Sequence, residues 1–451
     1  MIWWITFALL CLLTFFAMRK LGPDAGLACG IFAALLIPTW LLLDIWGLPV
    51  NMRVATSLAG LGMYCVHPDS QFRTKLTMAD LALLALVFIH LVSDIHHDGF
   101  HFAIPLRAYG EWMVPYLAGR AACQNLDDAR RALPWLVPLI LALAILGIFE
   151  SLTGIHTWEL VFGIRPEDGM IRSASRWGVY RPYGPTMWCI FFGNLQLALV
   201  PWAVYAGSRA LRKAAPPWWI VMPIASLTGV VFSISRAPII GAATLCYVWA
   251  FVRRPAWRIG LAVLAVIILI VAYTQRDRLL EGLQDWSGES DRLRKPQMTI
   301  DSETVVHTGT MSRVYLFSVY RRAMMRAGWI GFGTQSVTGF PVNVPVGPED
   351  TAALRHVKFI DNVYILMCLR FGRLGLLAFI TFGLASAVAA ARLAWHPQAH
   401  GADFLASLCG AVLGLMLTML TVWMPFDFGT MFLFDAGVIA GLRGHSEDGL
   451  D

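Results

Sequence analysis

The chain alternates between long apolar runs and short polar connections. The apolar runs are about 17–25 residues long, and a helix of that length crosses about 30 Å of hydrocarbon. They predict a first spanning helix at the N-terminus and further helices near 24–44, 53–66, 76–93, 103–121, 133–153, 185–206, 218–234, 237–252, 259–274, 374–392, 403–423 and 427–441. The pattern therefore predicts an all-α, polytopic integral membrane protein with about 12–13 transmembrane helices.

One hydrophilic segment, roughly 275–360, interrupts this pattern. Connections of this length inside a compact fold are usually either functional or disordered. Its later part carries apolar residues at helical spacing, which predicts a folded segment with an amphipathic helix. These residues are Val314, Phe317, Val319, Met324 and Met325.

The pattern divides the chain into four parts. They are N-terminal transmembrane helices (1–153), central helices with an external loop at 154–184 (154–274), a large external loop (275–373), and C-terminal helices with a short cytoplasmic tail (374–451).

Composition supports the membrane class. Hydrophobic residues make up 57% of the chain and charged residues 14%, whereas soluble domains carry about 25% charged residues. The net charge of +6 is explained by topology without any nucleic acid, because Lys and Arg collect in cytoplasmic loops. All eight cysteines lie in or beside apolar runs, which argues against a disulfide framework or a zinc site in the polar segment.

The basic residues also predict which side each connection faces. Alternate connections carry Arg or Lys and fall on one side, which is then the cytoplasm. Two connections on the opposite side are also basic: 154–184, which contains Arg165, Arg172, Arg176 and Arg181, and the long polar segment. They indicate an anionic ligand outside, although long translocated loops also escape the rule.

Arg236 and Arg313 are the candidate ligand-binding arginines. Arg236 lies in VVFSISRAPIIGAA, at the outer end of a predicted helix, where a charged residue is costly and usually functional. Its guanidinium matches phosphate oxygens, and a structural ion pair is the alternative. Arg313 begins the predicted amphipathic helix, and it either completes a clamp on a diphosphate or is a solvated surface residue.

Asp361 and Asn362 stand where the polar segment meets the apolar run FIDNVYILMCL. A carboxylate there can act as a general base towards a hydroxyl group. Asp361 can equally be the N-cap of the following helix, with Asn362 and Tyr364 continuing the turn.

Two further polar groups lie in apolar surroundings. Arg107 and Glu111 are four residues apart and can pair on one helix face, beside Pro105 and Pro115, which kink helices; simple packing is the alternative. A His/Asp patch can in principle bind a divalent metal, but its spacing fits no strict motif, so an interfacial loop is favoured and no metal site is predicted. The patch comprises His90, Asp94, His96, His97, Asp98 and His101.

Four stretches together resemble the O-antigen ligase and O-antigen polymerase family of bacterial inner-membrane proteins. They are YRPYGPTMWCIFFG, SISRAPIIGAA, TGTMSRVYLFSVYRRAMMRAGWIGFGTQSV and DNVYILMCLRFGRLGLLAF. The resemblance covers roughly 180–393.

The resemblance implies a reaction and its partners. Members of the family take a glycan from undecaprenyl diphosphate on the periplasmic side and join it to a sugar hydroxyl of lipid A core or of another lipid-linked repeat. No metal, nucleotide sugar or other cofactor is implied. The implied partners are the lipid-linked donor, the glycan or lipid acceptor, the bilayer and other polysaccharide-assembly proteins, with no nucleic acid.

The resemblance also implies roles for residues. Arg236 and Arg313 carry over as a diphosphate clamp, assisted by Arg172, Arg176 and Arg181. Ligases have His-Asn where this chain has Asp361-Asn362, which favours a polymerase of O-antigen or exopolysaccharide, with Asp361 as the base or as a group that orients the acceptor.

Two other functions stay open on the sequence. A transporter of a glycan or lipid-linked substrate would need a charged path through the membrane, and Glu111 is the main deep charge. A non-catalytic subunit of polysaccharide assembly would use the polar segment to bind a partner.

Overall fold

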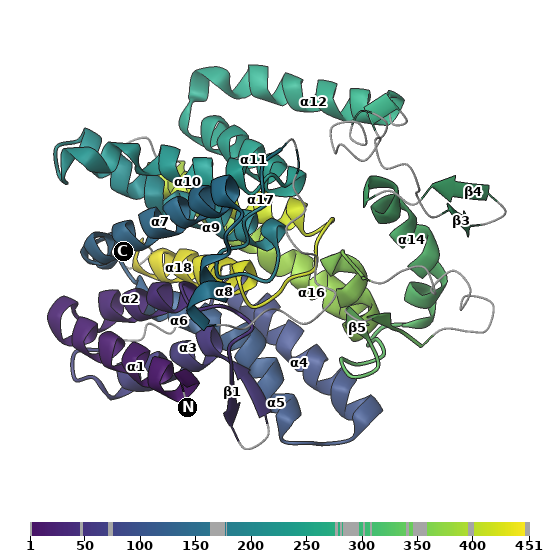
Figure 1. Cartoon of the computed structure of the whole chain (residues 1–451), viewed down its shortest axis with the longest axis horizontal. Coiled ribbons are helices and arrows are strands. Elements are labelled where there is room, and N and C mark those ends of the chain that lie inside the picture. The colour runs from purple at the N-terminus through teal and green to yellow at the C-terminus, as the bar shows by residue number, and fades with distance from the viewer. Residues whose placement is uncertain are drawn as a thin grey trace.

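Helices form most of the chain in the computed structural model (Figure 1). The structure describes residues 2–45, 48–70, 75–162, 176, 178–275, 278–279, 282, 297–300, 303–306, 309–339, 342–345, 359–395 and 401–446. Six helices in this part are long and apolar enough to cross a membrane. They are α1 (Ile2–Leu21), α4 (Met78–Asp98), α7 (Leu126–Thr153), α9 (Cys189–Leu211), α16 (Val363–Ala394), and the run Pro255–Thr274, which contains α12 (Arg258–Thr274). The predicted class, an all-α polytopic membrane protein, is confirmed.

Other predicted spans correspond to shorter or interrupted helices. These are α2 (Pro23–Leu35), α3 (Met52–Val66), α5 (Ala103–Ala108), the π-helix η1 (Tyr109–Met113), α6 (Val114–Ala122), η2 (Pro217–Val221), α10 (Met222–Phe232), α11 (Arg236–Arg253), α17 (Ala402–Thr418) and α18 (Phe428–Ser446). Outside these lie α8 (Thr157–Phe162), η3 (Pro255–Trp257) and α14 (Gly309–Arg326). The π-helix precedes Pro115, which cannot donate a backbone hydrogen bond, so the predicted irregularity in 103–121 is present.

The prediction of one helix over 24–44 is wrong in its second half. Helix α2 ends at Leu35, and Pro38 follows shortly after, where it biases the preceding residue towards extended backbone. The chain then forms the antiparallel hairpin of β1 (Leu42–Ile45) and β2 (Leu48–Asn51), with Leu42 opposite Asn51. Two more hairpins pair β3 (Gln297–Ile300) with β4 (Glu303–Val306), and β5 (Thr338–Gly339) with β6 (Val342–Asn343).

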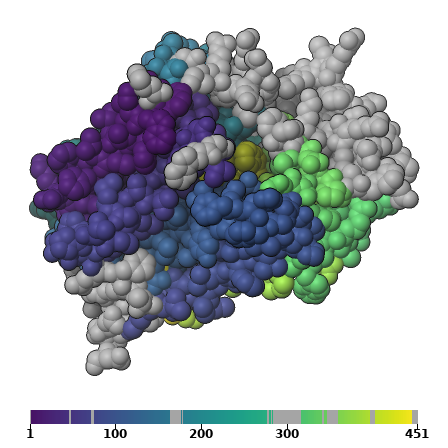
Figure 2. All heavy atoms as spheres, turned by 90° about the horizontal axis from the view of Figure 1, so that it is seen from below, coloured from purple at the N-terminus to yellow at the C-terminus, as the bar shows by residue number. Residues whose placement is uncertain are grey.

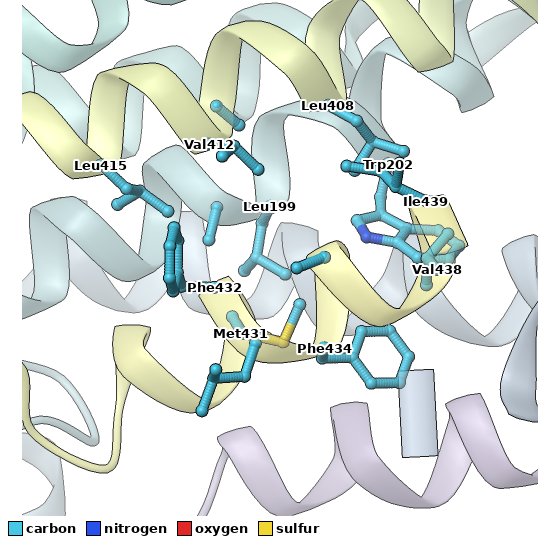
Figure 3. Packing of buried hydrophobic residues seen from close by; sticks show 14 of the residues in the cluster. Leu199, Trp202, Leu408, Val412, Leu415, Met431, Phe432, Phe434, Val438 and Ile439 are labelled. Carbon is cyan, nitrogen blue, oxygen red and sulfur yellow. The ribbon is translucent and has the colours of Figure 1, made fainter. Parts of the chain in front are cut away.

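The main core includes the packing between α9, α17 and α18 (Figure 3). Trp202 of α9 packs against Phe404 of α17 with ring centroids 5.1 Å apart, and its indole N–H donates to Asp435 of α18 at 3.0 Å. Close backbone approach joins α11 to α17, because a Cβ on Gly414 would lie 2.5 Å from the carbonyl oxygen of Gly241. Small residues at such contacts are typical of membrane helices.

The described part of the polar segment lies to one side of this bundle. Figure 1 shows α14 and the β3–β4 hairpin outside the group of packed helices. Figure 2 shows the green atoms of the α14 region beside the blue surface of α4 and α5. A hydrogen bond of 2.7 Å from the backbone N–H of Thr334 to Asp94 of α4 fixes this contact.

Candidate active site

A cavity of about 180 Å³ lies at the start of α9 and beside the residues that precede α16. Its wall contains one basic residue, Arg181, and one acidic residue, Asp361. The remaining wall is apolar or aromatic, apart from one hydroxyl side chain: Trp188, Cys189, Ile190, Phe191, Phe359, Thr421, Val422 and Trp423. A mainly apolar wall with a few polar groups is typical of a site for a small ligand.

Two aromatic pairs hold the wall together. The rings of Trp188 and Phe359 meet edge to face with centroids 5.9 Å apart. Those of Phe191 and Trp423 do the same at 5.5 Å. Such pairs add stabilisation beyond the area they bury, so three separate segments of chain are fixed around the cavity.

Arg181 and Arg176, both predicted as ligand-binding, reach the same turn. The Arg181 guanidinium donates to Ser235 Oγ at 2.9 Å, and Arg176 donates to the carbonyl oxygen of Ile234 at 3.2 Å. Ser235 precedes Arg236, the first residue of α11, which is half-buried. The structure therefore brings the basic loop 154–184 against the turn that carries Arg236.

Ile234 has a φ of 48°. Positive φ is a genuine outlier for a β-branched residue, and such strained backbone collects at functional sites. Ser233 Oγ bonds the carbonyl of Val230 at 2.7 Å, and Ser235 Oγ bonds that of Ser233 at 3.1 Å. These bonds and the two arginines hold the turn in its strained shape.

Asp361 and Asn362 occupy different environments. Asn362 is fully buried and is the N-cap of α16, because its side-chain oxygen accepts from the backbone N–H of Ile365 at 2.9 Å. Its amide also donates to the carbonyl of Leu420 at 2.8 Å. Asp361 is half-buried on the cavity wall. The N-cap alternative for Asp361 is therefore wrong, and capping falls to its neighbour.

Tyr364 makes contacts within the helix bundle and does not line the cavity. Its hydroxyl donates to the carbonyl of Met416 at 2.7 Å, and its ring packs edge to face on Phe379. The hydrogen bond joins α16 to α17.

Arg313 lies in the first part of α14, but its side chain is outside the described residues. Arg172 lies wholly outside them. The clamp role of Arg313 and the assisting role of Arg172 stay predictions.

Arg107 belongs to a second polar cluster, away from the cavity. Its guanidinium donates to Thr334 Oγ1 at 2.9 Å, where the sequence had suggested Glu111 as partner. Asp94 accepts from the backbone N–H and the hydroxyl of Thr334. His90 accepts from the indole of Trp112 at 3.1 Å and approaches Asp94 at 3.2 Å. The cluster ties α4 and α5 to the turn after α14, and sequence reasoning missed this role.

The His/Asp patch supplies this structural cluster. Within the described ranges, no group of three or more His, Cys, Asp or Glu residues could hold a metal ion. His97 also serves the contact, since its Nε2 lies 2.8 Å from the carbonyl oxygen of Gly331. Glu111 lies near enough to Arg370, Arg107 and His90 to interact electrostatically with them.

A glycine-rich turn after α14 inserts into a break in α16. Gly372 has φ 68° and ψ −166° inside the helix, and Gly331 of the turn has φ 79°. A Cβ on Gly331 would lie 2.2 Å from the carbonyl of Arg370, and a Cβ on Gly372 would lie 2.2 Å from that of Trp329. The sequences WIGFG and RFGRLG thus meet backbone to backbone.

Comparison with known families finds one match in this region. Residues 221–380 match the family model described as O-antigen ligase. No curated protein matches the chain. The match confirms the resemblance seen in the sequence and supports a role in polysaccharide assembly for this multi-pass membrane protein. The matched range contains Arg236, Arg313 and Asp361, whereas Arg181 precedes it.

Proposed function

Because residues 221–380 match the family model described as O-antigen ligase, we propose that this protein is a membrane glycosyltransferase. It polymerises or ligates glycan repeats carried on undecaprenyl diphosphate, in the synthesis of O-antigen or exopolysaccharide. It lies in the inner membrane of a bacterium and works on the periplasmic face. The positive-inside rule, which predicts that most basic connections are cytoplasmic, supports this orientation.

The observation that carries the proposal is that Arg181 and Asp361 both line one aromatic-walled cavity. The donor diphosphate binds at Arg181 and at the Ser235–Arg236 turn that Arg181 contacts, with Arg313 completing the clamp. Guanidinium groups placed there stabilise the charge that grows on the leaving diphosphate in the transition state.

The chemical step needs one further group. Asp361 takes the proton from the acceptor hydroxyl while the hydroxyl oxygen forms a bond to the anomeric carbon of the donor sugar. The bond from that carbon to the diphosphate oxygen breaks, and undecaprenyl diphosphate leaves. We propose a second lipid-linked repeat as the acceptor, because Asp361 stands where ligases of the family carry histidine.

The test is a reconstituted polymerisation assay. Purified protein in lipid vesicles receives undecaprenyl-diphosphate-linked repeats, and the products are separated on a gel. The wild type should produce a ladder and release the carrier, also with EDTA present. Asp361→Ala, Arg181→Ala and Arg236→Ala should each reduce the rate by about 100-fold or more.

Arg130→Ala is the control, because Arg130 is an exposed arginine whose partner Asp127 is also exposed; its ladder should match the wild type. No ladder and no released carrier from the wild type, with lipid A core also offered as acceptor, would contradict the proposal. That result would favour a transporter or a non-catalytic subunit.

A further inference from the structure

Glu150 is a fully buried acidic residue near the end of α7. Its Oε2 atom accepts hydrogen bonds from the backbone N–H groups of Tyr183 at 3.1 Å and Gly184 at 2.9 Å. Its Oε1 atom accepts from the N–H of Thr157 at 3.2 Å. One side chain therefore binds both ends of the external loop 154–184.

The turn that Glu150 holds is the one that carries Arg181. On its other side, Ser151 Oγ donates to the carbonyl of Tyr180 at 2.8 Å, and the N–H of Tyr180 donates to the carbonyl of Ser151 at 3.1 Å. Arg181 is thus bracketed by bonds from two consecutive residues of α7. Its side chain donates to Ser235 and lines the cavity.

Two further contacts make this turn rigid. The ring of His156 stacks on that of Tyr183 with centroids 3.8 Å apart. Gly184 has a φ of 47°, and a Cβ there would lie 2.7 Å from the ring of Phe192. The backbone that follows Arg181 is therefore fixed by packing as well as by Glu150.

We propose that Glu150 is a positioning residue that sets Arg181 at the donor diphosphate. The inference rests on the proposed function, because it gives Arg181 the diphosphate as ligand. Glu150 does not line the cavity and acts through the backbone of Tyr183 and Gly184. A displacement of about 1 Å in a ligand-binding group is enough to lower a rate by about 100-fold.

A double-mutant cycle tests the inference with the full-length protein in vesicles. Glu150→Ala should lower kcat/KM for the lipid-linked donor by about tenfold or more. In the Arg181→Ala background the same change should have an effect of less than about twofold, since the group that Glu150 positions is already absent. Glu150→Gln keeps one acceptor oxygen, so it should lower kcat/KM less than Glu150→Ala does.

Asp128→Asn is the matched control. Asp128 lies at the opposite end of α7 and also binds backbone N–H groups, those of Gln124 and Asn125. Its replacement should lower the thermal unfolding temperature and leave kcat/KM unchanged. If Glu150→Ala does not fold, Glu150→Gln takes its place in the cycle.

The outcomes separate this inference from the proposed function. If Glu150→Ala lowers kcat/KM by the same factor in the wild-type and Arg181→Ala backgrounds, the positioning role is overturned and the proposed function still stands. If the wild type shows no turnover, the proposed function fails and the cycle is measured on binding of undecaprenyl diphosphate alone. A wild type that also fails to bind this carrier would overturn the inference.

Discussion

Asp361 and Asn362 are adjacent in the chain but serve different purposes. Asn362 is fully buried and makes hydrogen bonds to Ile365 and Leu420. Asp361 borders the cavity with Arg181. The helix-capping role and the proposed catalytic role thus fall on neighbouring residues.

Replacing each residue should separate the two effects. Asn362→Ala removes the N-cap and a second buried hydrogen bond, so it should lower the free energy of unfolding by about 1–3 kcal/mol. Asp361→Asn keeps the shape of the side chain, so it should leave the unfolding temperature in detergent unchanged while the polymerisation rate falls. Equal loss of stability in both variants would show that Asp361 is a structural residue.

The sequence identified this pair but could not assign the cap. Both Asp and Asn are good N-caps, and the choice depends on where the helix begins. The amide of Asn362 also donates to the distant carbonyl of Leu420, a contact that the local sequence does not reveal. For Arg181, too, the sequence identified the residue but not its partner in the fold. It was predicted to assist through its charge, and its contact with Ser235 joins segments that are 54 residues apart.

At the scale of elements, the break in α16 is the main departure from a regular helix. The backbone N–H groups of Phe332 and Gly333 donate to the carbonyls of Leu369 and Arg370, at 2.8 and 3.0 Å. Beyond the break, the N–H of Arg373 donates to the carbonyl of Gly328 at 3.1 Å. The turn after α14 therefore satisfies backbone groups that the break leaves without helical partners.

Gly372→Ala should displace this turn. The new Cβ would need space that the backbone of Trp329 occupies, in a backbone conformation that is almost confined to glycine. We expect faster cleavage of the polar segment by a protease added to the folded protein. Gly99→Ala is the control, because Gly99 has a similar backbone conformation, φ 74° and ψ 174°, but nothing within 4 Å of a Cβ; it should cost about 1–3 kcal/mol from backbone strain alone. Equal cleavage of both variants would contradict the docking role.

Hydropathy located most helices but not their breaks. The predicted span 374–392 lies inside a helix that begins at Val363 and is interrupted at Gly372. An apolar run also gave no sign that 42–51 folds as a hairpin. Both departures depend on contacts with other parts of the chain or on proline, which average hydropathy does not register.

At the scale of the whole molecule, one buried arginine joins three distant parts. Arg53 of α3 is 1% exposed. Its guanidinium donates to the carbonyls of Leu35 and Pro185, both at 3.2 Å, and of Phe426 at 3.1 Å. It therefore connects the end of α2, the approach to α9 and the loop before α18. In the sequence, Arg53 is only the first residue of the predicted span 53–66, and nothing there marks its later partners.

Arg53→Ala should be among the most destabilising single changes in the described structure. It leaves several buried carbonyl groups without a donor, at a cost of about 3–5 kcal/mol. The measurement is the unfolding temperature of the purified protein in detergent. Arg130→Ala, at an exposed ion pair, should change the free energy of unfolding by less than about 1 kcal/mol. Similar unfolding temperatures for the two variants would show that Arg53 is not a structural centre.

The bonds of Arg53 also set an order of events during biogenesis. The carbonyl of Phe426 is added to the chain 373 residues after Arg53, which at about 5–20 residues per second takes on the order of tens of seconds. When α3 enters the bilayer, the carbonyl of Phe426, one of the hydrogen-bond acceptors of Arg53, has therefore not yet been synthesised. Arg53 therefore cannot reach its full set of hydrogen-bond acceptors until the chain has been synthesised as far as Phe426.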